Sequence, residues 1–221
     1  KVRYNPNIVG ILVINPDNPT GMVYPEKILR EIVSIAEAFN LFLIFDEIYE
    51  NIIYNGAQTA PMAKVIGKVP GISLKGISKE VPWPGARCGW AEYYNRDQDD
   101  EFNKLCQTID NAKMIEVSAT TLPQRAIPKI MTDHRYEPFL KMTSRNIGQR
   151  SKKLFDFFTQ IPYVNFNLTN GAFYNTIIFK AGALKPKQQL NITDPKIAQL
   201  LESWLTPEMP LDQRFVYYLL A

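Results

Sequence analysis

Apolar residues in this chain follow two patterns, short unbroken runs and longer stretches with helical spacing. Residues 8–15 and 41–49 read IVGILVIN and LFLIFDEIY, and such continuous runs are typical of strands buried on both faces. Between them, residues 25–40 place apolar side chains at helical intervals and begin with Pro25, at a position where a helix tolerates proline. A strand, a helix and a strand within this length predict a βαβ unit with parallel strands.

The pattern continues with two weaker strands, at residues 71–76 and 88–94. The spacing of apolar residues then predicts three helices, over residues 98–114, 122–133 and 136–161. Pro128 lies inside the second of these helices and is expected to kink or shorten it.

The composition changes near residue 160. Residues 171–179 alternate like a strand of another sheet, and residues 180–191 predict a polar loop. Residues 194–205 predict a helix that begins with an aspartate cap and a proline at its first helical position.

These elements predict an α/β fold, with a mostly parallel sheet flanked by helices and part of a smaller α+β domain. We expect a partial large domain over residues 1–135, a long connecting helix over 136–160 and a partial small domain over 161–221. A core-like strand starts within the first ten residues, and the sequence closes on the apolar stretch RFVYYLLA, so we expect it to be a piece of a longer polypeptide.

Composition excludes several classes of protein. The formal net charge of +3 is spread along 221 residues without a run of like charges, which argues against nucleic acid as the main partner. Cys88 and Cys106 form no Cys-x-x-Cys pattern, and without a disulfide framework or signal peptide we expect a cytoplasmic protein. No apolar stretch is long enough to cross a bilayer, so no membrane partner is expected.

Polar residues follow each of the predicted parallel strands. The turn NPDNPTG, with Asn18 as its second asparagine, follows the first strand; Asp46 and Tyr49 follow the second; Ser78 and Lys79 follow the third. Ligands of open parallel sheets bind beyond the carboxyl ends of the strands. If the strands are neighbours, an amide, a carboxylate, a phenol and an amine converge on one edge.

Three charged residues near this edge each have a structural and a chemical interpretation. Asp46 follows four apolar residues, so it is either a cap or salt-bridge partner, or a partner for a protonated ring nitrogen. Lys79 is either a surface lysine or, beside the apolar loop PWPGARCGW, a poorly solvated amine that attacks a carbonyl. Arg87 is either part of a structural ion pair or a bidentate clamp for a phosphate.

An amine, a carboxylate and a guanidinium in these roles are the attachments that pyridoxal 5'-phosphate requires, and we predict that cofactor. The chain has no Gly-x-Gly-x-x-Gly after a strand and no Walker loop, which argues against dinucleotides and nucleoside triphosphates. The one histidine, His134, is expected at the surface. With only two cysteines, we expect no zinc site.

Three stretches of the sequence resemble motifs of the class I and II aminotransferases, which are fold type I pyridoxal-phosphate enzymes. They read NPDNPTG, FDEIY and SKEVPWPGARCGW, in the family's order and at family-like separations. The later GAFY resembles the start of that family's small-domain strand. In the first motif, two prolines and a glycine are expected to hold the turn rigid.

The resemblance implies a role for each matched residue. Lys79 would hold the cofactor through its amine and carry a proton during the reaction. Asp46 would pair with the pyridine nitrogen, and Arg87 would bind the phosphate. Tyr49 and Asn18 would each hydrogen-bond the phenolic oxygen of the ring.

The sequence also departs from the family's pattern. Gly76 stands where the family often has a serine or threonine that binds the phosphate, so phosphate binding would depend more on Arg87, with Ser78 as a weak substitute. The family's phosphate loop and ring-stacking aromatic would precede this chain, and its carboxylate-binding arginine would follow it. Because the family builds its site across a subunit interface, the resemblance implies a homodimer.

The expected reaction is transamination between an amino acid and a 2-oxo acid, both small molecules. The motifs leave two alternatives open. One is a pyridoxal-phosphate lyase or synthase of the same fold, such as a C–S lyase or an aminocyclopropane-carboxylate synthase. The other is a non-catalytic regulator that keeps the scaffold.

Overall fold

The computed structural model describes residues 5–221, so residues 1–4 of the expected large domain lie outside the described residues. The chain forms two compact units. The first comprises the residues up to Leu154 together with Asn167–Thr176, and the second comprises Phe155–Phe166 and Ile177–Ala221.

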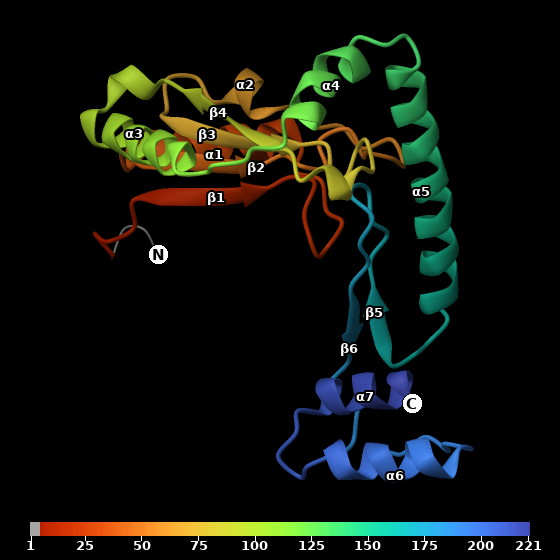
Figure 1. The fold of residues 1–221 in the computed structure, drawn as a ribbon. Helices are drawn as coiled ribbons and strands as arrows, with labels where there is room; N and C mark the ends of the chain where they lie inside the picture. Colours follow the sequence, from red (N-terminus) through yellow and green to blue (C-terminus); the bar gives the residue numbers. More distant parts are fainter. Residues whose placement is uncertain (1–4) are drawn as a thin grey trace. The chain divides into compact units, whose positions relative to one another are not determined.

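The first unit is built on a four-stranded sheet with the order β1-β2-β3-β4 (Figure 1). Its strands are β1 (Gly10–Ile14), β2 (Phe42–Asp46), β3 (Gly71–Gly76) and β4 (Gly89–Tyr94). The first three are parallel and β4 is antiparallel to β3. This arrangement confirms the predicted α/β class and the four strands of the first half of the chain.

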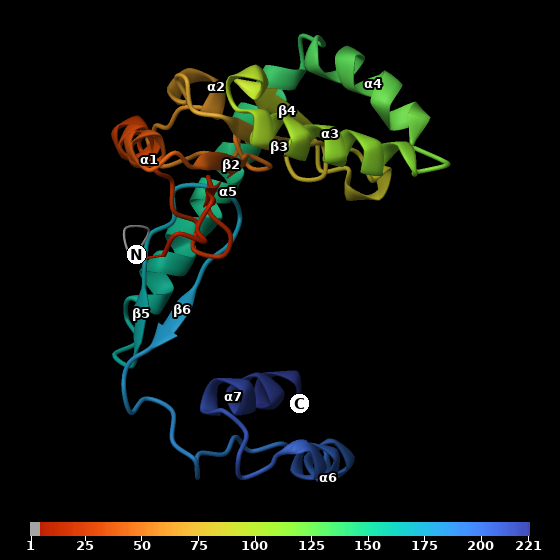
Figure 2. The same ribbon diagram turned by 90° about the vertical axis from the view of Figure 1, so that its left-hand side faces the viewer.

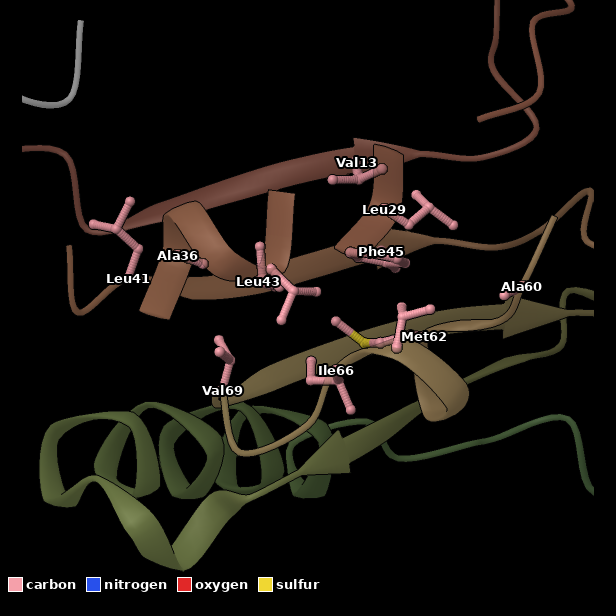
Figure 3. Packing of buried hydrophobic residues seen from close by; sticks show 12 residues of the cluster. Val13, Leu29, Ala36, Leu41, Leu43, Phe45, Ala60, Met62, Ile66 and Val69 are labelled. Carbon is pink, nitrogen blue, oxygen red and sulfur yellow. The ribbon is translucent and has the colours of Figure 1, made fainter. Parts of the chain in front are cut away.

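Alternate residues of the sheet pack against helices on its two faces. On one face, Leu43 and Phe45 contact α1 (Glu26–Ala38) and α2 (Met62–Val65), and Figure 3 shows this cluster. On the other face, Ile72 packs with Phe102 and Cys106 of α3 (Asp100–Met114). The period of two along each strand therefore supplies both layers of the core.

The edge strand β1 is less buried than its sequence predicts. Val13 faces the α1 side and is 5% exposed, but Leu12 on the opposite side is 60% exposed. The cluster that α3 forms includes residues of β2, β3 and β4 and none of β1. Because α3 does not cover β1, the prediction that this strand is buried on both faces is wrong for Leu12.

The first unit also contains two short 3-10 turns and two further helices. A short 3-10 turn, η2 (Pro84–Ala86), precedes β4, and a second, η3 (Arg96–Gln98), follows it. Helix α4 (Thr121–Met131) contains Pro128 within its length, and α5 (Tyr136–Phe158) begins in this unit. Within residues 5–221, no helix is both long and apolar enough to cross a membrane.

The second unit contains a two-stranded ribbon and two helices, which Figure 2 shows from a second direction. Strand β5 (Val164–Phe166) pairs antiparallel with β6 (Ile177–Phe179). Helix α6 (Pro195–Trp204) is capped by Asp194, whose carboxylate accepts hydrogen bonds from two backbone amides, as predicted. Helix α7 (Leu211–Leu220) was not predicted.

The predicted strand at residues 171–179 is shorter in the structure. Only Ile177–Phe179 forms a strand, while Gly171 makes an isolated antiparallel bridge to Ile53 in the first unit. The preceding residues pack into the first unit, where Ala172 joins a buried cluster with Tyr49. Tertiary contacts therefore interrupt an alternating pattern that by itself favours a strand.

Candidate active site

The parallel strands end together at one edge of the sheet. Ile14 lies opposite Asp46, and Asp46 lies opposite Leu74. The chain leaves β1 and β2 at this level, and β3 continues to Gly76: the Asn15 amide donates to the carbonyl of Asp46 at 3.0 Å, and the Glu47 amide donates to that of Leu74 at 3.0 Å. The loops that follow β1, β2 and β3 therefore start side by side, as the sequence predicts.

The first loop is closed by its first asparagine. Asn15 is 4% exposed, and its side-chain amide donates to Thr59 Oγ1 at 2.8 Å. Its Oδ1 accepts from the Tyr24 amide at 2.9 Å, and Thr59 Oγ1 donates to the Tyr24 carbonyl at 2.6 Å. The two ends of the loop are thus joined by hydrogen bonds, two of them partly buried.

The turn inside this loop presents Asn18 at its exposed tip. The Asp17 amide donates to the Met22 carbonyl at 2.9 Å, and the Gly21 amide donates to the Asp17 carbonyl at 3.0 Å. The Asp17 carboxylate accepts hydrogen bonds from the amide and the hydroxyl of Thr20. The peptide bonds before both prolines of the turn are cis.

Gly21 is required where this turn contacts a distant segment. Its φ is +67°, and a Cβ atom there would lie 2.6 Å from Thr169. The Gly21 carbonyl accepts from the amides of Asn170 and Gly171 at 2.9 and 3.1 Å. The close approach holds the first loop against the stretch that leads to Tyr174.

At the end of β2, the neighbouring residues Asp46 and Glu47 differ in burial and in hydrogen-bond partners. Asp46 is half-buried and its Oδ1 accepts from the Ile48 amide at 3.2 Å. Glu47 is 3% exposed, and its carboxylate accepts from the Met62 amide at 2.7 Å and from Ser73 Oγ at 2.5 Å. Burial raises the pKa of Glu47, although these two hydrogen bonds oppose the shift. Glu47 therefore belongs to the protein's interior.

Tyr49 lies in an aromatic cluster. Its side chain is 2% exposed, and its hydroxyl oxygen is 2.6 Å from that of Tyr174. Its ring packs edge-on against the rings of Phe173 and Tyr174 at centroid distances of 5.3 and 5.6 Å. Burial raises the Tyr49 pKa well above its ordinary value, and so do the Tyr174 hydrogen bond and the charge of nearby Asp46. The phenol is therefore a hydrogen-bonding group at neutral pH.

Two lysines near the end of β3 differ in their partners. Lys75 Nζ is 2.6 Å from a Glu50 oxygen and 3.5 Å from a Glu47 oxygen. Burial alone would lower the Lys75 pKa, but these carboxylates raise it above its ordinary value and keep the ammonium form. Lys79 Nζ instead lies 5.9 Å from the Tyr49 ring centroid and 5.8 Å from that of Phe173. Of the two amines, Lys79 is the one without a carboxylate partner among residues 5–221.

Arg87 follows η2 in the left-handed region, with a φ of +48°. Its side chain is exposed, and its Nη1 donates to the Pro84 carbonyl at 2.9 Å. Gly76, at the end of β3, is closely surrounded: a Cβ atom there would lie 3.1 Å from the Cys88 carbonyl oxygen. A serine at position 76 would therefore require its neighbours to move.

The structure brings some of the predicted site residues into measured proximity. Tyr49 lies in the turn that directly follows Asp46, and Lys79 Nζ lies 5.9 Å from the centroid of the Tyr49 ring. Asn18 and Arg87 lie on exposed loops that follow β1 and β3, and no hydrogen bond in the described chain joins either to these three residues.

Sequence reasoning did not assign Phe173 and Tyr174 to the site. Their contacts with Tyr49 and Lys79 cross more than ninety positions of the sequence. The only local signal is the aromatic pair within GAFY, which the sequence analysis treated as the start of a strand.

Comparison with known proteins extends over the whole chain. The sequence profile described as aminotransferase class I and II matches residues 3–204. An uncharacterized aminotransferase of Methanocaldococcus jannaschii is 48% identical over 221 residues, covering 100% of this chain and 51% of that protein. A tyrosine aminotransferase of Caenorhabditis elegans is 33% identical over 76% of this chain and 36% of its own length.

A solved structure also resembles this one. The alanine aminotransferase from Pyrococcus furiosus superposes with a TM-score of 0.70 and 29% sequence identity, over 78% of this chain and 43% of that one. The chain spans about half the length of the Methanocaldococcus relative and less than half of the other two proteins.

Proposed function

This chain belongs to the class I and II aminotransferase family, and from that premise we propose that its protein transfers an amino group between an amino acid and a 2-oxo acid. Members of the family depend on pyridoxal 5'-phosphate. Since the chain spans about half of its first relative, the activity of the whole protein is part of the proposal.

The placement of Lys79 is the observation that carries this proposal. Its amine lies over the Tyr49 and Phe173 rings, at the sheet edge where Asp46 ends β2. No salt bridge among residues 5–221 holds Lys79, Asp46 or Arg87. An amine, a carboxylate and a guanidinium that have no ionic partners among the described residues fit the carbonyl, ring nitrogen and phosphate of the cofactor.

Each side chain has a distinct task in this proposal. The cofactor, when bound, supplies an aromatic ring that accepts electrons from the reacting bond. The Asp46 carboxylate would pair with the ring nitrogen and keep it protonated, and the Tyr49 hydroxyl and Asn18 amide would donate to the phenolic oxygen. Arg87 binds the phosphate with parallel N–H groups. Lys79 would hold the cofactor covalently through its amine, and as a neutral amine it would take and return a proton.

We also propose the finer assignments that follow from the family. The domains are a partial cofactor-binding domain over residues 1–135, a connecting helix over 136–160 and a partial small domain over 161–221. The protein is a cytoplasmic homodimer. Support for an interface comes from a run of exposed apolar side chains between α3 and α4, where Ile115 is 78% and Val117 is 96% exposed.

The proposed reaction has two alternatives from the same scaffold, a lyase or synthase and a non-catalytic regulator. The relatives named above are aminotransferases, and no contact in the described site favours elimination or cyclisation. A half-reaction separates the three: only an aminotransferase, given one amino acid, stores the amino group on the cofactor and passes it to an added 2-oxo acid.

Substitution of Lys79 tests the proposal directly. Lys79→Arg removes the amine and keeps the charge, and Lys75→Arg is the matched control because Lys75 is also near the end of β3. After borohydride reduction of the complete protein with pyridoxal 5'-phosphate, peptide mass analysis should find the cofactor on residue 79. The label should be lost in K79R and kept in K75R. A label that persists in K79R, or a wild-type protein without one, would overturn the proposal.

A further inference from the structure

Glu80, the residue after Lys79, holds a single residue of a neighbouring loop at two points. Its side chain is 8% exposed, and Oε1 accepts from the Asn51 backbone amide at 2.7 Å. Oε2 accepts from the Asn51 side-chain amide at 2.9 Å. A carboxylate that accepts two hydrogen bonds from one residue fixes both its distance and its orientation.

Asn51 ends the turn that carries Tyr49. Within this turn the Ile52 amide donates to the Tyr49 carbonyl at 2.8 Å. The Asn51 carbonyl in turn accepts from Ser144 Oγ of α5 at 2.9 Å. Glu80 and Ser144 therefore hold opposite groups of Asn51, just beyond Tyr49.

The Glu80–Asn51 hydrogen bonds connect the loop that carries Lys79 with the turn that carries Tyr49. Lys79 and Tyr49 are 5.9 Å apart, amine to ring centroid, and neither is hydrogen-bonded to the other in the described chain. Their nearest hydrogen-bonded link is the pair Glu80–Asn51, one residue from Lys79 and two from Tyr49. We propose that Glu80 is a positioning residue, which sets the Tyr49 hydroxyl relative to the Lys79 amine for cofactor binding.

The charges around Glu80 indicate that this residue positions Asn51 and does not stabilise the fold through its own charge. It lines a cavity of about 110 Å³ together with Glu47, Glu50, Glu92 and Lys75. Four carboxylates face one ammonium group there, and Tyr136 also lines the cavity. Burial raises the pKa of Glu80, and the hydrogen bonds from Asn51 only oppose this shift. A buried carboxylate in an acidic cavity contributes little to stability. We therefore attribute its two hydrogen bonds with Asn51 to positioning.

The inference rests on the proposed function, and the test uses three variants of the complete protein. Glu80→Gln keeps one acceptor and turns the other into a donor that faces the Asn51 side-chain amide. The matched control is Glu92→Gln, since Glu92 lines the same cavity and also accepts two hydrogen bonds, from Trp90 and Tyr94. The double variant E80Q/N51D exchanges donor and acceptor, restores both bonds and keeps the net charge.

Two readouts apply to each variant. The first is hydrogen exchange at the Asn51 amide without cofactor, and the second is the dissociation constant for pyridoxal 5'-phosphate, followed by its absorbance. We expect E80Q to speed the exchange and raise the dissociation constant about tenfold each, because charge-assisted hydrogen bonds have this strength. E92Q should change neither, and E80Q/N51D should return both values toward the wild type.

The outcomes separate this inference from the proposed function. If E80Q matches E92Q in both readouts, or if the folded double variant stays at the level of E80Q, the positioning role is wrong. A wild-type protein that binds no cofactor contradicts the proposed function, while the exchange readout still decides whether Glu80 holds Asn51. Should E80Q fail to fold, Asn51→Ala removes only the side-chain bond and is expected to give a smaller increase in the same two values; no increase would refute the role.

Discussion

The hydroxyl oxygens of Tyr49 and Tyr174 lie 2.6 Å apart, although 125 positions separate the two residues in the sequence. The Tyr49 hydroxyl, which we propose as a donor to the cofactor, is thus engaged by another phenol. Cofactor binding requires this hydroxyl to turn away from Tyr174 or to share its hydrogen bonds.

The tyrosine pair leads to opposite expectations for its two members. Tyr49→Phe removes the proposed donor and should weaken pyridoxal 5'-phosphate binding about tenfold, the usual value of such a hydrogen bond. Tyr174→Phe leaves the Tyr49 hydroxyl available, so affinity should stay the same or increase. Fluorescence titration with the cofactor checks both, and equal losses in the two variants would argue against Tyr49 as the donor.

The two asparagines of the first loop should separate stability from binding. Asn15→Ala removes the partly buried hydrogen bonds to Thr59 and Tyr24 and should lower the free energy of unfolding by about 2 kcal/mol. Asn18 is exposed, so Asn18→Ala should change stability by less than about 0.5 kcal/mol and instead weaken cofactor binding. Urea denaturation measures the stability of each variant, and cofactor titration measures its affinity. The expectation fails if Asn18→Ala loses more stability than Asn15→Ala.

Gly21 and Gly56 offer a comparison of packing with backbone strain. Both have positive φ, but a Cβ atom at Gly21 would lie 2.6 Å from Thr169, whereas nothing lies within 4 Å of one at Gly56. Gly56→Ala should lower the free energy of unfolding by about 1 kcal/mol from strain alone, and Gly21→Ala by about 3 kcal/mol. Chemical denaturation gives both values, and similar losses would mean that the Thr169 contact yields easily.

Arg87 should recognise the phosphate and no other part of the cofactor. Arg87→Gln is expected to raise the dissociation constant for pyridoxal 5'-phosphate by about tenfold to a hundredfold, because it removes a charged bidentate donor. Binding of pyridoxal, which has no phosphate, should be unchanged and serves as the control. A parallel loss for both ligands would indicate that Arg87 supports the loop instead.

The buried carboxylate of Glu80 should make stability depend on pH. Its pKa in the folded protein is raised above 4.5, the ordinary value for glutamate, mainly by burial. A raised pKa favours the protonated folded state, so this contribution to stability is present below about pH 4.5 and is lost as the pH rises through the folded pKa.

Glu80→Gln cannot titrate and should lack this loss. The unfolding free energy of the wild type minus that of E80Q should therefore decrease between about pH 4.5 and neutrality. Urea denaturation at several pH values measures the difference. A difference that stays constant or increases with pH would show that the Glu80 pKa is not raised.

Local sequence determined the elements that build the site. Continuous apolar runs predicted β1 and β2, because a buried parallel strand is apolar on both faces, and β3 was predicted from a weaker apolar pattern. Asp46 ends β2, Tyr49 and Lys79 follow strand ends, and neighbouring parallel strands must bring such residues to one edge. The cap of Asp194 and the helix after it were also predicted, since capping depends on residues within one turn.

Tertiary structure alone decided which distant residues complete that edge. The Tyr49–Tyr174 and Glu80–Asn51 contacts join segments far apart in the chain, and neither periodicity nor propensity records such pairs. The same holds for Leu12, which has the pattern of a buried strand but lies where α3 does not reach. The apolar pattern of a segment depends on residues close in sequence, whereas the burial of a side chain and its contact partners depend on how the elements pack.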